Sequence, residues 1–169
     1  MKGFFYRNWE EPTYLGPVVF IRVFCGYYFL STATFKFLNP ALYSSAPYAA
    51  MIKDAAAINP SPGYQGFLTN WVLPNIDFFR FLNIFGEFAM GLALVLGLFT
   101  RLAALVGIFA VYNYWFTLGV RGATPVAPGT PQITKLFVFG LAAVFLTAAG
   151  RSFGIDRWLH QKFPRNPLF

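Results

Sequence analysis

Residues 83–105 read NIFGEFAMGLALVLGLFTRLAAL, an apolar stretch with a carboxylate, Glu87, far from either end. Gly97 is placed to end one helix, and Thr100 is placed to cap the next. So short a connection predicts an antiparallel helical hairpin with Arg101 at its turn. The apolar length on both sides of the turn suits a lipid bilayer, where a buried charge is costly. The fold and the role of Glu87 are therefore linked questions.

The composition favours a membrane protein. The chain has 169 residues, of which 57% are hydrophobic and 11% are charged, and its mean hydropathy is +0.52. Soluble domains carry about 25% charged residues because their surfaces face water. This chain has too few charges to cover a water-soluble globule.

Four apolar stretches have lengths near the ~20 residues that cross a hydrocarbon core. They cover residues 15–37, 78–99, 102–120 and 133–150. Lipid offers no hydrogen bonds to the backbone, so each stretch is expected to be helical. The last two are short enough for buried helices of a soluble protein, but the chain has no amphipathic partner for them. The first is too long for a signal peptide and lacks a cleavage site. We predict an all-α membrane protein, a four-transmembrane-helix bundle forming one domain over residues 1–169.

The long connection over residues 39–77 is predicted to be an ordered outer lid. Residues 49–58 have the composition of a short helix, and residues 63–73, GYQGFLTNWVL, mix aromatic and polar side chains as interfacial segments do. Loops of this length in compact proteins are usually functional or disordered. Short interfacial helices lying on the membrane are therefore expected here.

The distribution of charge predicts orientation and excludes nucleic acid as a partner. The net charge is +7, but the basic residues flank apolar stretches and do not form a basic, aromatic-bearing surface. Seven basic residues fall on the side that holds both termini: Lys2, Arg7, Arg101, Arg151, Arg157, Lys162 and Arg165. Five fall on the other side: Lys36, Lys53, Arg80, Arg121 and Lys135. The positive-inside rule then places both termini in the cytoplasm.

Three polar residues are predicted to meet inside the membrane. Counting ~1.5 Å per residue, Glu87 and Asn113 lie at nearly the same depth, and the long side chain of Arg22 is expected to reach towards them. An unpaired charge at mid-bilayer costs at least ~2.5–3.5 kcal/mol, which predicts an Arg22–Glu87 pair. Two interpretations stay open: a structural clasp that fixes helix register, or a site that handles a proton or binds a quinone.

The sequence offers no ligands for a metal or a covalent cofactor. It has one histidine, His160, and one cysteine, Cys25. This excludes a haem ligand pair, an iron–sulfur or zinc cluster and a Ser–His–Asp triad. Any oxidoreductase role would need a diffusible quinone, a non-covalent cofactor or a partner subunit.

Three segments resemble the DoxX/DoxD family of integral membrane proteins. They are RVFCGYYFLSTATFKF (22–37), GEFAMGLALVLGLFTRLAAL (86–105) and AAGRSFGIDRWL (148–159). The residues that fall on recurrent positions of the family are Arg22, Lys36, Glu87, Thr100, Arg101, Gly150 and Asp156.

The resemblance implies a four-helix bundle in a bacterial or archaeal cytoplasmic membrane. Its DoxD branch is similar to the membrane subunit of thiosulfate:quinone oxidoreductase, which implies quinone as the ligand, further protein subunits as partners and an enzymatic role only together with them. Other members resemble accessory subunits. A non-catalytic subunit of a larger respiratory or photosynthetic complex is therefore the alternative. The resemblance assigns no catalytic residues.

Overall fold

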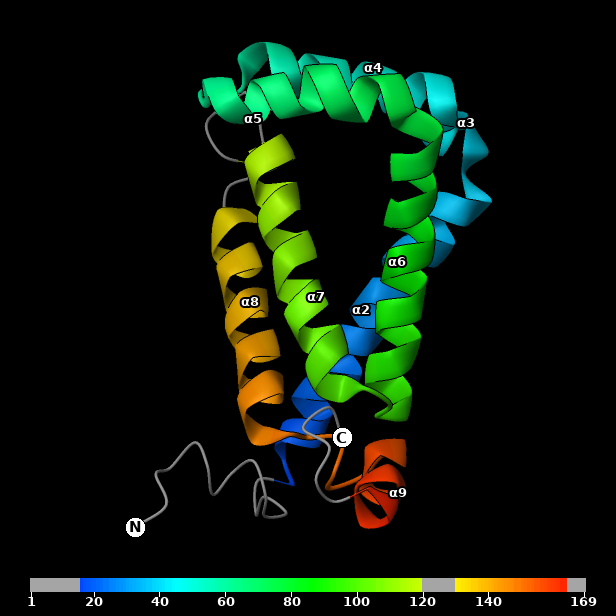
Figure 1. Cartoon of the computed structure of the whole chain (residues 1–169), viewed down its shortest axis with the longest axis vertical. Helices are drawn as coiled ribbons and strands as arrows, with labels where there is room; N and C mark the ends of the chain where they lie inside the picture. Colours follow the sequence, from blue (N-terminus) through cyan, green and yellow to red (C-terminus); the bar gives the residue numbers. More distant parts are fainter. Residues whose placement is uncertain (1–15, 120–129, 164–169) are drawn as a thin grey trace.

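The computed structural model describes residues 16–119 and 130–163, and this part of the chain is helical without any strand, which confirms the all-α prediction (Figure 1). Four long segments run side by side. They are α2 (Val18–Leu38), α6 (Ile76–Leu96), α7 (Thr100–Tyr114) continued by the π-helical turn η3 (Trp115–Gly119), and α8 (Thr130–Thr147). The core between them is formed by Cys25, Phe29, Met90, Leu94, Ala103, Ala104, Val111, Leu141, Val144 and Ala149.

Two segments of the described chain are long and apolar enough to cross a membrane. One is α2, and the other is the helical run Pro62–Leu96, which contains α6. A shorter apolar helix covers Lys135–Thr147 within α8. The helices begin and end within a few residues of the predicted spans. Leu15 and Val120, which the sequence analysis placed at span ends, lie outside the described residues.

The lid is a set of short helices that lies across one end of the long helices (Figure 1). Its elements are α3 (Pro40–Tyr43), α4 (Ser45–Ile58), α5 (Pro62–Phe67), η1 (Leu68–Val72) and η2 (Leu73–Asn75). The helix expected over residues 49–58 is the C-terminal part of α4. The lid has an apolar core of its own, made of Tyr48, Ile52, Ala56, Leu68 and Val72. This core explains why so long a connection is ordered.

The turn between α6 and α7 differs from the prediction in its cap. Gly97 ends α6 in the left-handed conformation, with φ 68°, as its lack of a side chain allows. Thr100 was expected to cap α7, and this was wrong, because Thr100 is the first residue of the helix and Phe99 is at the cap position. The Thr100 hydroxyl has no hydrogen-bond partner among the described residues. The Asp156 carboxylate, from α9 (Ile155–Lys162), instead accepts hydrogen bonds from the backbone N–H groups of Phe99 (2.7 Å) and Thr100 (2.8 Å).

Helices α2 and α6 approach each other most closely where two glycines face. A Cβ on Gly91 would lie 2.8 Å from the Gly26 carbonyl oxygen, and a Cβ on Gly26 would lie 2.9 Å from the Gly91 carbonyl oxygen. Both contacts are to backbone atoms, which a rotamer change cannot relieve. Small residues are the usual means by which membrane helices approach so closely.

We therefore expect Gly91→Ala to destabilise the protein by ~1–3 kcal/mol, because the added methyl group overpacks a backbone contact. Gly86→Ala is the matched control in the same helix. A Cβ at Gly86 meets nothing within 4 Å, so the change should be neutral or slightly stabilising through helix propensity. Thermal unfolding of both variants in one detergent measures the difference. Equal melting temperatures for the two would contradict the close contact.

Candidate functional site

A buried ion pair joins α2 to α6. Glu87 is only 2% exposed, and its Oε1 lies 2.6 Å from Nζ of Lys36. The same Nζ donates a hydrogen bond of 2.7 Å to Oδ1 of Asn83, one turn before Glu87 on α6. Helical side chains lean towards the N-terminus of their helix. Lys36, in the last turn of α2, therefore leans back into the bundle and towards the carboxylate.

Two tyrosines from other elements complete this group. The Tyr48 hydroxyl, on lid helix α4, accepts a hydrogen bond of 3.1 Å from Nδ2 of Asn83. Tyr114, at the end of α7, lies close enough to interact electrostatically with Glu87, and Nζ of Lys36 lies 5.1 Å from the centre of its ring. We call these five residues, Lys36, Tyr48, Asn83, Glu87 and Tyr114, the Lys36–Glu87 cluster. It draws side chains from α2, α4, α6 and α7.

The cluster contains an acceptor without a donor. Oε2 of Glu87 is buried and has no hydrogen-bond partner among the described residues, although the Tyr114 side chain interacts with the same carboxylate. A buried polar atom in this state costs ~1–3 kcal/mol, and more when it carries charge. Burial raises the pKa of Tyr48 to about 12, so this hydroxyl keeps its proton at neutral pH. The arrangement is suited to a ligand that donates to Glu87 and accepts from its neighbours.

The predicted pair between Arg22 and Glu87 was wrong. Arg22 is 3% exposed and donates a hydrogen bond of 2.9 Å from Nη1 to the carbonyl oxygen of Ala149, beside Gly97 at the opposite end of the bundle from the lid. Arg22 lies in the second turn of α2, and its side chain leans towards the N-terminus of that helix, away from Glu87. Lys36 pairs with Glu87 instead.

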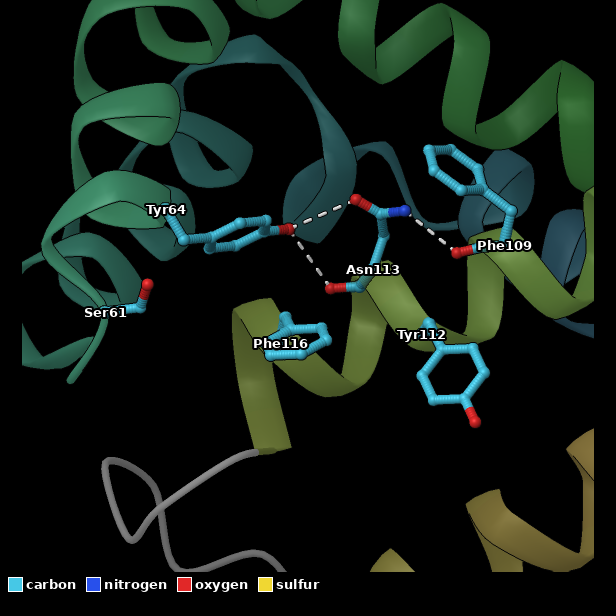
Figure 2. Close-up of a pocket in the computed structure, with 6 residues that line it drawn as sticks. All are labelled: Ser61, Tyr64, Phe109, Tyr112, Asn113 and Phe116. Atoms are coloured by element: carbon cyan, nitrogen blue, oxygen red, sulfur yellow. Dashed lines mark hydrogen bonds between the residues drawn. The ribbon is translucent and has the colours of Figure 1, made fainter.

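Asn113 also lies apart from Glu87 and belongs to a second site. Its Nδ2 donates to the carbonyl oxygen of Phe109 at 2.8 Å, and its Oδ1 and backbone oxygen accept from the Tyr64 hydroxyl, each at 3.3 Å. Figure 2 shows Tyr64 reaching from lid helix α5 to Asn113 on α7. These residues line a pocket of about 320 Å³, together with Ser61, Tyr112 and Phe116. Asn113 and Tyr114 are neighbours in sequence, but a helical step of about 100° separates their directions.

Three further family positions, Thr100, Arg101 and Asp156, gather where α9 meets the bundle, together with Arg22 and Arg151. All five side chains are at most 4% exposed. Burial lowers the pKa of Arg151, and the nearby Asp156 carboxylate opposes that shift. A Cβ on Gly150 would overlap both Thr100 and Asp156, which requires glycine there. This group fastens α9 to the α6–α7 turn and is distant from Glu87.

The sequence analysis did not predict the tyrosines of the cluster as neighbours of Glu87. Asn83 lies four residues before Glu87 on one helix face, so that spacing places it beside Glu87. Tyr48 and Tyr114 had no such signal, because their proximity depends on how the lid and α7 pack. Within residues 16–119 and 130–163, no group of three or more His, Cys, Asp or Glu side chains is placed to hold a metal.

The DoxX family profile matches residues 18–119. The chain belongs to the DoxX family. The matched region of this DoxX protein runs from α2 to η3 and contains the whole Lys36–Glu87 cluster. Gly150 and Asp156 lie beyond it, and the family positions themselves stay a prediction. No solved structure matches this DoxX chain.

Proposed function

We propose that this DoxX protein is the quinone-binding membrane subunit of an electron-transfer enzyme, with thiosulfate as the electron donor at a partner subunit. The head group of the quinone would lie at the Lys36–Glu87 cluster. The observation that supports the proposal is the buried Oε2 of Glu87, which has no hydrogen-bond partner in the described chain. A lipid-soluble ligand with a hydroxyl or carbonyl group at its head fits that environment.

The residues of the cluster have complementary roles in this proposal. Lys36 and Tyr114 donate hydrogen bonds to a quinone carbonyl, and Glu87 accepts one from a quinol hydroxyl. A quinone that takes two electrons from a partner subunit and two protons becomes a quinol. Glu87 exchanges one of those protons, and Lys36 stabilises the carboxylate when the proton has left. Tyr48 and Asn83 hold the pair in position from the lid side.

The same proposal includes the arrangement in the membrane. The 21 residues of α2 and of α6 correspond to ~31 Å of helix each, the thickness of a hydrocarbon core. We propose that α7 with η3 and α8 cross beside them, in a bacterial or archaeal cytoplasmic membrane. Arg101, Arg151, Arg157 and Lys162 lie at the α9 end, which favours a cytoplasmic position for that end. If an impermeant thiol reagent labelled Lys162→Cys in intact cells, the cytoplasmic position of the α9 end would be wrong.

The key variant is Glu87→Gln, which keeps the shape and one acceptor but does not exchange a proton near neutral pH. Because it also leaves Lys36 without its anion, its melting temperature is measured beside its activity. We expect thiosulfate-dependent quinone reduction in membranes to fall ~100-fold or more, the range for losing a general acid or base. Asp77→Asn is the matched control, since it makes the same change at an exposed carboxylate of the same helix. Its activity should equal that of the wild type.

The result also separates the two functions that the sequence analysis left open. If the Glu87→Gln protein reduced and bound quinone as well as the wild type, the proposal of a quinone site at Glu87 would be wrong. The cluster would then be a structural clasp, and the chain would be a non-catalytic accessory subunit of a larger complex. Quinone found in the wild-type protein purified in mild detergent, and depleted in Glu87→Gln, would support the proposal directly.

A further inference from the structure

The short helix α9 presents aromatic and basic side chains on its outward side. Trp158 is 60% exposed, and Phe153, just before the helix, is 69% exposed. Ile155, Trp158 and Lys162 follow one another at spacings of three and four residues, so they form one stripe along the helix. Arg157 lies one helical step beside that stripe and is also exposed. The outward side of α9 therefore combines apolar surface with positive charge.

The start of α9 is fixed at the level where α6 ends (Figure 1). The backbone N–H of Asp156 donates a hydrogen bond of 2.8 Å to the carbonyl oxygen of Gly97, the residue that ends α6. A Cβ on Gly154 would lie 2.8 Å from Cα of Gly97, so the two backbones are in contact. Since α6 belongs to a helical run long enough to cross the hydrocarbon core, its end marks the boundary of that core. Trp158 and Phe153 thus lie at the depth where membrane proteins concentrate tryptophan.

Positive charge gathers at the end of the bundle that carries α9. Within residues 16–119 and 130–163, this end holds one acidic side chain, Asp156, and five basic side chains. The basic side chains are Arg22, Arg101, Arg151, Arg157 and Lys162. In the same part of the chain the lid end holds, besides the Lys36–Glu87 pair, three basic and two acidic side chains: Lys53, Arg80 and Lys135, with Asp54 and Asp77. This asymmetry gives the α9 end a positive potential that attracts anions.

We propose that α9 is an interfacial helix that binds the headgroups of anionic phospholipids. Trp158 and Phe153 insert beside the acyl chains, while Arg157 and Lys162 donate hydrogen bonds to lipid phosphates. Nζ of Lys162 lies 5.3 Å from the centre of the Trp158 ring, so the cation and the ring are presented together. A soluble acidic protein would pair with the charges but would not reach the hydrocarbon boundary where the rings lie. The inference rests on the membrane arrangement proposed above and not on the quinone site, because α9 lies at the opposite end of the bundle from the lid (Figure 1).

The first test identifies the lipid beside Trp158. Full-length protein is reconstituted in phosphatidylcholine vesicles with a minor share of phosphatidylglycerol, and one of the two lipids carries bromine near the top of its acyl chains. Bromine quenches tryptophan fluorescence on contact, and the Trp158 signal is the wild-type signal minus that of Trp158→Phe. We expect phosphatidylglycerol to be enriched at least about fivefold around Trp158, the effect of a basic residue at an anionic surface. Quenching by both lipids in proportion to their shares would refute the lipid preference, and no quenching by either would refute the membrane arrangement as well.

The second test removes the charges of α9. Arg157→Gln and Lys162→Gln should each lower the enrichment about twofold to fivefold, and the double variant should bring it close to the share of phosphatidylglycerol in the bilayer. Lys53→Gln is the matched control, since it removes an exposed lysine from lid helix α4, and it should leave the enrichment unchanged. Both α9 positions are exposed, so the variants should fold as the wild type does, which their melting temperatures check. An enrichment that survives the double variant, or that falls equally in Lys53→Gln, would refute the role of α9.

Discussion

Replacing Lys36 with methionine is expected to destabilise the protein by ~3–5 kcal/mol, the usual cost of removing one partner from a buried ion pair. Methionine fills a similar volume, so the loss would come from charge and not from a cavity. It leaves the Glu87 carboxylate, 2% exposed, without its cation, and Asn83 without its donor. Thermal or denaturant unfolding in mild detergent measures the change.

Two further variants test whether the pair is the cause. The double change Lys36→Met with Glu87→Leu removes both charges and should cost much less than Lys36→Met alone, because no buried charge is left uncompensated. Arg80→Met breaks an exposed pair with Asp77, whose atoms are 3.9 Å apart, and should cost less than ~1 kcal/mol. A double variant as unstable as the sum of its two single variants would show that Lys36 and Glu87 do not stabilise each other.

Asp156→Ala is the second change with a large expected effect, again ~3–5 kcal/mol. The carboxylate caps α7 through two backbone N–H groups and is the anion nearest the buried guanidinium groups of Arg22 and Arg151. Its loss removes the cap and leaves positive charge less compensated. The stability of Asp156→Asn should lie between those of the wild type and Asp156→Ala, since the amide oxygen of asparagine still accepts one hydrogen bond.

The matched control is Asp54→Ala, at an exposed carboxylate of lid helix α4. The melting temperature of each variant in the same detergent gives the comparison. An Asp156→Ala protein as stable as Asp54→Ala would contradict the capping role. The quinone-reduction activity of Glu87→Gln is measured in the same experiment. It distinguishes the role of Asp156 in attaching α9 to the bundle from the proposed role of Glu87 at the quinone site.

Much of the helical architecture could be predicted from the sequence, because apolar runs of this length leave the backbone few alternatives in lipid. The burial of Glu87 followed from the same argument. The partner of Glu87 could not be predicted in this way, because counting residues along a helix gives the depth of the Cα atoms but not the direction of the side chains. Arg22 and Lys36 both lean towards the start of α2, which takes one of them away from Glu87 and the other towards it.

The capping of α7 could not be read from local sequence. Thr100 has the side chain of a good cap, but it is the first residue of the helix and not the cap residue. The Asp156 carboxylate, 56 residues further along the chain, accepts the hydrogen bonds instead. A charged acceptor on two N–H groups is stronger than a hydroxyl on one. Such contacts depend on how distant helices pack, as do those of Tyr48 and Tyr114 with their neighbours in the cluster.

The attachments of α7 restrict the motions open to it. Asp156 holds its first turn, while at the lid end Asn59 donates to the carbonyl oxygen of Phe116 at 2.8 Å and Tyr64 bonds Thr117 at 2.8 Å. Hydrogen bonds at both ends of a helix oppose its sliding along its own axis. A rotation about that axis would move Tyr114 sideways past Glu87. We therefore expect any opening of the cluster towards lipid to be lateral.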